Sequence, residues 1–159
     1  MLFTGDYEHS FDQKNRLSIP ARFRQLLSPD TVGDKFYLII AANKRLCLYP
    51  DKYFEELVKR DPAELIPDEK VLQFEQLTFG LARMLEIDNT GRILVPEKMI
   101  RRAALGREVV IIGVKDHLEI WNRSDWEQYV ENGLSDYSQT LNRARLARRS
   151  PGSGPMTDR

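Results

Sequence analysis

The pattern of apolar and polar residues along the chain repeats itself once. Residues 11–20, FDQKNRLSIP, and residues 87–96, IDNTGRILVP, match position for position at an offset of 76 (88 − 12). In each copy two apolar runs flank a short polar stretch, which predicts a β-hairpin with a bulged turn. The last turn residue is Asn15 in one copy and Gly91 in the other, the residue types that most readily accept a positive φ.

The same patterning predicts the order β-β-α-β-β around the first turn. Residues 2–11 alternate like a strand with one buried face, and residues 16–19 are expected to form its partner. Pro20 begins a short helix to about residue 27, because proline fits the first helical position. Two further strands are expected at 36–40 and 46–49, joined by a polar turn.

The second copy repeats this order, although its offset falls to 72 near the second pair of strands. Its expected strands are 85–87, 92–95, 109–112 and 118–121, with a helix from Pro96 and another capped by Ser124. The pattern predicts a mainly β protein with short helices (α+β). The expected divisions are a first unit at 6–53, linking helices at 54–81, a second unit at 82–125, a C-terminal helical region at 126–149 and a disordered tail at 150–159.

Two copies in one chain are expected to complete each other. A single unit of about 45 residues is too small to bury its strands alone. If the units interleave into one shared barrel, no long strand edge is left exposed. The two turns would then be related by a pseudo-twofold axis, the symmetry with which DNA-binding dimers engage a duplex.

Composition narrows the class of protein. The 24 basic and 24 acidic residues cancel, so the local distribution of charge matters more than the total. No apolar run approaches the length of a membrane span, and the N-terminus lacks the features of a signal peptide, so a cytoplasmic location is expected. Cys47 is the only cysteine and is expected to be a small buried residue, so no disulfide and no metal or other cofactor is predicted.

The sequence does not indicate an enzyme or a small-molecule substrate. His9 and His117 have no setting typical of a catalytic triad or a metal site, and both are expected to be structural or surface residues. The glycines stand singly and form no phosphate-binding loop. A carboxylate pair such as Glu55 and Glu56 lies in a helical pattern and is expected to face solvent.

Each turn is expected to carry a structural aspartate and an exposed arginine. Asp12 and Asp88 can each accept a hydrogen bond from a backbone N–H two residues on, which would fix the loop. From residue 12 to 24 the net charge is +3, whereas the equivalent window from 88 to 100 is neutral. Since phosphate affinity grows with the number of cations, the first turn is expected to do most of any DNA binding.

The expected DNA contacts are therefore uneven. Arg16 is predicted to make the chief contact, to guanine or to phosphate, and an ion pair with Asp12 is the structural alternative. Arg92 is the weaker counterpart, for which the ion pair is the preferred interpretation. The full set of predicted DNA-binding residues is Lys14, Asn15, Arg16, Arg22, Arg24 and Arg92.

The paired motifs resemble those of the MraZ family of bacterial transcriptional regulators, which are built from two SpoVT-AbrB units. The resemblance rests on the two Asp-x-x-x-Arg turns with their downstream prolines, the start MLFTG, and the segments LCLYP and EIW. It implies an AbrB-type swapped-hairpin, double-psi-like β-barrel in a ring-shaped homo-oligomer. It also implies a nucleoid-associated repressor that binds direct repeats in the promoter of the division and cell-wall gene cluster, including its own gene.

Two other functions remain open from the sequence. Related units occur in antitoxins, although those usually carry one unit and a long toxin-binding tail. A ring scaffold that binds only proteins is the other alternative. The arginine-rich segment 142–149 is expected to be helical and could attract DNA nonspecifically, although a solvated helix face is the commoner explanation.

Overall fold

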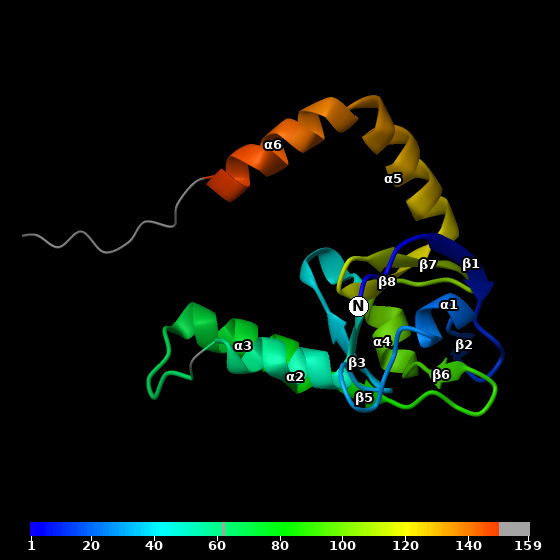
Figure 1. The fold of residues 1–159 in the computed structure, drawn as a ribbon, viewed down its shortest axis with the longest axis horizontal. Coiled ribbons are helices and arrows are strands. Elements are labelled where there is room, and N and C mark those ends of the chain that lie inside the picture. The colour runs from blue at the N-terminus through cyan, green and yellow to red at the C-terminus, as the bar shows by residue number, and fades with distance from the viewer. Residues whose placement is uncertain (62, 150–159) are drawn as a thin grey trace, which may run out of the picture. The chain divides into compact units, whose positions relative to one another are not determined.

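The computed structural model describes residues 1–61 and 63–149 as a mixture of short helices and antiparallel strands (Figure 1). The first copy contains β1 (Asp6–Ser10), β2 (Arg16–Ser18), α1 (Ala21–Arg24), β3 (Phe36–Ile40), the 3₁₀ turn η1 (Ala42–Lys44) and β4 (Leu46–Pro50). The second contains β5 (Arg83–Leu85), β6 (Arg92–Leu94), α4 (Glu97–Arg102), β7 (Glu108–Val114) and β8 (His117–Asn122). The α+β class and the order β-β-α-β-β are confirmed.

Helices follow each copy. After the first copy come α2 (Asp51–Lys59) and α3 (Glu69–Leu81), and after the second come α5 (Arg123–Ser135) and α6 (Tyr137–Arg149). The capping role predicted for Ser124 is wrong, because α5 begins one residue earlier and Ser124 lies inside it. The basic segment 142–149 is helical, as expected. The predicted disordered tail, 150–159, lies outside the described residues.

The strands on either side of the turns at 12–15 and 88–91 do not pair with each other, so the hairpins predicted there are wrong, whereas β3 pairs with β4 and β7 with β8 as expected. β1 pairs with β7 of the second copy, and β5 pairs with β3 of the first. β2 and β6 pair with each other in a separate two-stranded sheet. The larger sheet has the order β1-β7-β8-β4-β3-β5, in which β4 and β8 meet at the centre. Each copy thus supplies strands to the other, as expected for two units that are too small to fold alone.

The strand register shows where the second copy is shorter than the first. The pairing of β1 with β7 matches that of β5 with β3 only if Phe36 corresponds to Val109, an offset of 73. In β4 and β8 the offset is 72, since Leu48 corresponds to Ile120. Three residues are therefore lost before β7 and a fourth in the β7–β8 turn. The fall in offset from 76 to 72 is therefore divided between two loops.

One apolar core joins the two copies. Leu17 and Ile93 face each other from β2 and β6, and both are fully buried. Phe23 of α1 packs edge-on against Phe3 and Tyr7, with ring centroids 5.6 and 5.0 Å apart. These contacts hold the N-terminal segment and α1 beside the turns, so the core fixes the geometry of the surface described below.

A second, smaller apolar cluster lies on the other face of the large sheet, beneath α2. It consists of Ile39, Cys47 and Phe54, with Tyr49 and Val58 packed against it. Residues 1–123 form one compact unit, and the described residues from Ser124 onward form another. Among the helices of the described ranges, none has the length and apolarity that crossing a bilayer requires.

Candidate nucleic-acid interface

The first turn is organised around the carboxylate of Asp12. Its Oδ1 accepts hydrogen bonds from the backbone N–H groups of Lys14 and Arg16, both at 2.9 Å, and its Oδ2 accepts one from Arg16 Nε at 2.7 Å. The backbone closes through Asn15 N–H to the carbonyl of Asp12 at 3.1 Å. Asn15 has a φ of 60°, as the sequence predicted. This carboxylate fixes both the loop and the arginine that leaves it.

The second turn repeats this geometry. Asp88 Oδ1 accepts from the N–H groups of Thr90 and Arg92 and from the Thr90 hydroxyl, and Oδ2 accepts from Arg92 Nε at 3.2 Å. Gly91 has a φ of 81°, in the left-handed region that favours glycine. The matching hydrogen bonds show that the two turns repeat each other in structure as well as in sequence.

Both aspartates are held in the ionised form. The backbone N–H of Arg16, followed by its side chain, lowers the pKa of Asp12 below the ordinary value of 3.8. The N–H of Arg92 and the hydroxyl of Thr90 hold the pKa of Asp88 well below that value. Hydrogen bonds donated to a carboxylate favour its charged form. Each turn therefore carries a fixed negative charge beside its arginine.

The two turns lie side by side. Ile19 donates its backbone N–H to the carbonyl of Gly91 at 2.9 Å, and Val95 donates to Asn15 at 3.0 Å, so each strand is bonded to the other copy's turn. In addition, Arg92 Nη1 lies 3.7 Å from Asp12 Oδ2. We call residues 12–16 and 88–92, together with Arg22 and Arg24, the paired-turn face.

Arg24 belongs in space with the second turn, although its sequence window is that of the first. Its Nε donates to the carbonyl of Ile19 at 3.1 Å. A Cβ atom added to Gly91 would lie only 2.7 Å from the guanidinium carbon of Arg24. The guanidinium therefore covers Gly91. A cation of the first copy thus lies beside the second turn, whose own sequence window has no net charge.

Arg16 is less free than the sequence pattern predicted. Its side chain is 34% exposed, and its Nε is in the ion pair with Asp12 that had been the structural alternative. No described residue accepts a hydrogen bond from either Nη group of Arg16. The ion pair thus orients the guanidinium and still leaves its Nη groups to meet a ligand. Lys14 and Arg22 are exposed.

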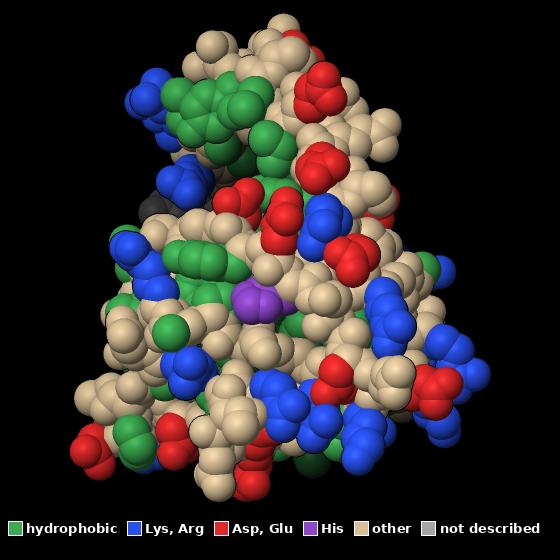
Figure 2. Space-filling view, turned by 90° about the vertical axis from the view of Figure 1, so that its right-hand side faces the viewer, with side chains coloured by type: hydrophobic (Ala, Val, Ile, Leu, Met, Phe, Trp, Pro, Cys, Tyr) green, Lys and Arg blue, Asp and Glu red, His purple; other side chains and the backbone are tan. Residues whose placement is uncertain are grey.

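The surface around these elements is rich in cations. α1, β2 and β6 lie at the right of Figure 1, and that side faces the viewer in Figure 2. Lys and Arg side chains gather in its lower right, with acidic side chains between them. The paired-turn face itself carries five cations and two carboxylates, a net charge of +3 (5 − 2), which gives a local positive field.

A protein-family model matches both copies of the repeat, together with helices that follow them. The family model described as "MraZ protein, putative antitoxin-like" matches this chain twice, over residues 2–73 and 78–149. The second match runs past the strands through α5 and α6, and the first runs through α2 and ends within α3, at residue 73.

Several relatives share most of their length with this chain. A protein named transcriptional regulator MraZ from Alkaliphilus metalliredigens (strain QYMF) is 35% identical over 145 residues, which cover 89% of this chain and 96% of that relative. The protein of the same name from Clostridium acetobutylicum is 34% identical, over 84% of this chain and 90% of its own. That from Roseiflexus castenholzii is 36% identical, over 79% and 85%.

Proposed function

The chain belongs to the MraZ family of transcriptional regulators, and from that premise we propose that it binds double-stranded DNA through the paired-turn face. The observation that carries the proposal is the pair of neighbouring turns, each presenting an arginine oriented by an ionised aspartate. Orientation matters because a guanidinium held in place loses less entropy when it binds guanine or phosphate.

We assign the roles as follows. Arg16 makes the chief contact through its Nη groups, bidentate to guanine or to phosphate. Lys14 and Arg22 are exposed and contact phosphates, and Asn15 shapes the loop tip. Arg92 is the counterpart in the second turn, supported by Arg24, whose guanidinium lies over Gly91.

The regulated site is proposed to be a set of direct repeats in the promoter of the division and cell-wall gene cluster, which includes the protein's own gene. Binding there represses transcription, and the protein acts in the cytoplasm at the nucleoid. A chain with zero net charge gains little from nonspecific attraction. A ring of chains on successive repeats gains affinity through effective concentration instead.

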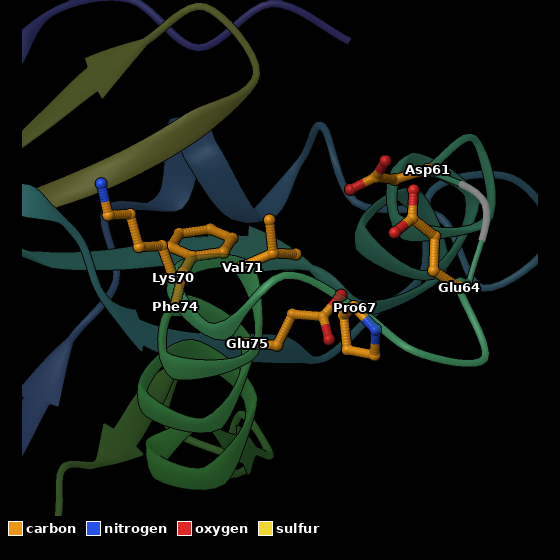
Figure 3. Close-up of a pocket in the computed structure, with 7 residues that line it drawn as sticks. All are labelled: Asp61, Glu64, Pro67, Lys70, Val71, Phe74 and Glu75. Carbon is orange, nitrogen blue, oxygen red and sulfur yellow. The ribbon is translucent and has the colours of Figure 1, made fainter.

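Self-assembly into a homo-oligomeric ring is supported by the apolar surface of α3. Phe74 and Leu77 are 62% and 57% exposed, and they line a groove of about 850 Å³ with Ile39 and Ile40 of β3. At the start of the helix a smaller hollow of about 430 Å³ is lined by Val71, Phe74 and several carboxylates (Figure 3). Contiguous apolar surface of this kind marks interaction sites in soluble proteins.

The helices after the second copy carry a similar apolar surface. Leu134 and Leu146 are each 66% exposed, and Tyr129 and Tyr137 are about as exposed, at 60% and 59%. Because α5 and α6 follow the second copy as α2 and α3 follow the first, we propose that both helix pairs contribute to contacts between chains.

The test is a mobility-shift titration with the chain's own promoter repeats and with a scrambled sequence, each at two salt concentrations. Wild-type protein is expected to prefer the repeats at both salt concentrations. Arg16→Ala should abolish the specific shift and leave the oligomer intact. Arg83→Ala, at an exposed arginine on β5 outside the paired-turn face and the helix pairs, is the matched control. Specific binding retained by Arg16→Ala would contradict the assigned contact.

Two other functions are distinguished by the same experiment. The family description contains the word antitoxin-like, so a protein partner is the second candidate. Equal affinity for repeats and scrambled DNA, together with capture of a single protein partner, would favour the antitoxin or the ring scaffold over the repressor.

A further inference from the structure

Three side chains with metal-binding atoms converge where β4 of the first copy meets β8 of the second. Cys47 and Glu119 are partners across the two strands, and His117 lies two residues before Glu119 on the same face. The Cys47 sulfur, a His117 ring nitrogen and a Glu119 oxygen all lie within 4.8 Å of one another. Alternate residues of one strand and the residue opposite them share a sheet face, which brings such atoms together.

The distance between His117 and Glu119 suits a shared metal ion better than a tight ion pair between these two residues. His117 Nε2 lies 3.3 Å from Glu119 Oε1, which is long for a charge-assisted hydrogen bond. It matches the separation of two ligands that are each about 2.0–2.1 Å from one tetrahedral zinc ion. Cys47 is buried, and the side chains of His117 and Glu119 are only 15% and 20% exposed. The site is thus largely shielded from solvent.

Outer groups orient two of the three ligands. Asp116 Oδ1 lies 2.8 Å from His117 Nδ1, and the hydroxyl of Tyr53 donates to Asp116 Oδ2 at 2.8 Å. Trp121 Nε1 donates to Glu119 Oε2 at 2.7 Å, which leaves Oε1 toward the histidine. A carboxylate behind a metal-bound histidine is the common outer-shell arrangement of zinc sites.

The pseudo-twofold axis that relates the two copies passes through this cluster. The metal-binding side chains nevertheless lie on only one side of that axis. At the offset of 72, Cys47 and Glu119 correspond to each other, and His117 corresponds to Arg45. The His117 ring stacks on Tyr49 at 4.7 Å, and the Arg45 guanidinium lies over the corresponding Trp121 at 3.2 Å. Arginine cannot ligate a metal, so ligands are available only on the histidine side.

We propose that Cys47, His117 and Glu119 bind one Zn²⁺ ion per chain, with a water as the fourth ligand. Thiolate, imidazole and carboxylate together suit zinc and cobalt better than magnesium or calcium. The ion would join β4 to β8 and so fasten the two copies. Asp116 is a positioning residue for His117. This proposal does not depend on DNA binding.

The alternative is a metal-free ion pair built on a histidinium. Burial acts to lower the pKa of His117, but Cys47, Glu119 and Asp116 raise it to about 10. The two states differ in what they bind. A protonated imidazole cannot ligate a metal, and metal binding releases protons.

The test uses chelator-treated full-length protein titrated with Zn²⁺ and, separately, with Co²⁺. We expect one ion per chain, a higher midpoint of thermal unfolding with Zn²⁺, and the thiolate-to-cobalt charge-transfer band with Co²⁺. Cys47→Ser should lose that band, and Asp116→Asn should weaken affinity by about 10–100-fold. His9→Gln, a histidine on β1 outside the cluster, is the control.

The wild-type cobalt spectrum requires no variant to fold. Failure to bind one ion per chain, or a cobalt spectrum without the charge-transfer band, would overturn the site and leave the histidinium ion pair. Unchanged metal content in Cys47→Ser and His117→Gln would also overturn it, since the ion would then be held elsewhere.

Discussion

Arg92 Nη1 lies 3.7 Å from Asp12 Oδ2, so the carboxylate that orients Arg16 of the first copy also faces the arginine of the second. Asp88, by contrast, is bonded to the arginine of its own turn. The pairing is therefore unequal, and Asp12 is the group through which the two turns are coupled.

This asymmetry predicts different effects for two matched substitutions. Asp12→Asn should loosen Arg16 and Arg92 together, whereas Asp88→Asn should loosen only Arg92. Mobility shift on promoter repeats is expected to show the larger loss of specific affinity in Asp12→Asn. Equal losses in the two variants would contradict the coupling. Circular dichroism of both variants controls for unfolding.

Gly91 and Asn15 allow a second matched comparison. Gly91→Ala places a Cβ at a φ of 81° and against the guanidinium of Arg24, so it should destabilise the protein by about 1–2 kcal/mol. Asn15→Gly removes a side chain at a φ of 60°, which glycine accepts readily, and should change stability by much less. Urea unfolding of the two variants measures the difference. A tolerated Gly91→Ala would mean that this turn relaxes.

The sequence pattern predicted the elements better than their partners. The apolar periods placed β3, β4 and their counterparts within about a residue or two, because those strands are buried and bounded by turns. It could not show that β1 pairs with β7, since a local hairpin and an exchanged strand present the same alternation of residues. Strand pairing depends on contacts between the two copies, which the local alternation of residues does not encode.

The candidate site shows the same limit. The matching turns, with Asp12, Arg16 and their counterparts, were visible as a repeat in the sequence. The position of Arg24 over Gly91 was not, because charge summed along a window assigns a residue to its neighbours in the chain. Cys47 and His117 are separated by 70 residues (117 − 47), so their meeting depends on the central pairing of β4 with β8.

Of the aromatic residues near the turns, Phe23 is predicted to lower the free energy of unfolding most when it is truncated. It is fully buried and packs against Phe3 and Tyr7, so Phe23→Ala should lower the free energy of unfolding by about 3–5 kcal/mol. Leu26→Ala, on the same segment but 36% exposed, is the control and should cost far less. Urea unfolding gives both values. A small loss in Phe23→Ala would show that α1 is not held by this contact.

The lowered pKa values of Asp12 and Asp88 predict loss of stability in acid. Each carboxyl has a folded pKa below 3.8, so its contribution is fully present above that pH and is lost as the pH falls through the folded value. Asp88→Asn should therefore flatten the acid limb of the stability curve, measured as unfolding midpoints from about pH 5 downward. Asp30→Asn, at an exposed position outside both turns, is the control. An unchanged acid limb in Asp88→Asn would contradict the hydrogen-bonded carboxylate.

Lys14 and Arg16 lie two residues apart in one turn, yet the proposed contacts predict distinct losses. If Lys14 meets only phosphate, Lys14→Ala should weaken binding to repeats and scrambled DNA alike and reduce the salt slope by about one. Arg16→Lys keeps the charge but loses the planar fork, so it should cost about 1–3 kcal/mol on the repeats and little on scrambled DNA. Affinities measured over a series of salt concentrations separate the two effects. If Arg16→Lys weakened both DNAs equally, Arg16 would be a phosphate contact and the bases would be read by another residue of the paired-turn face.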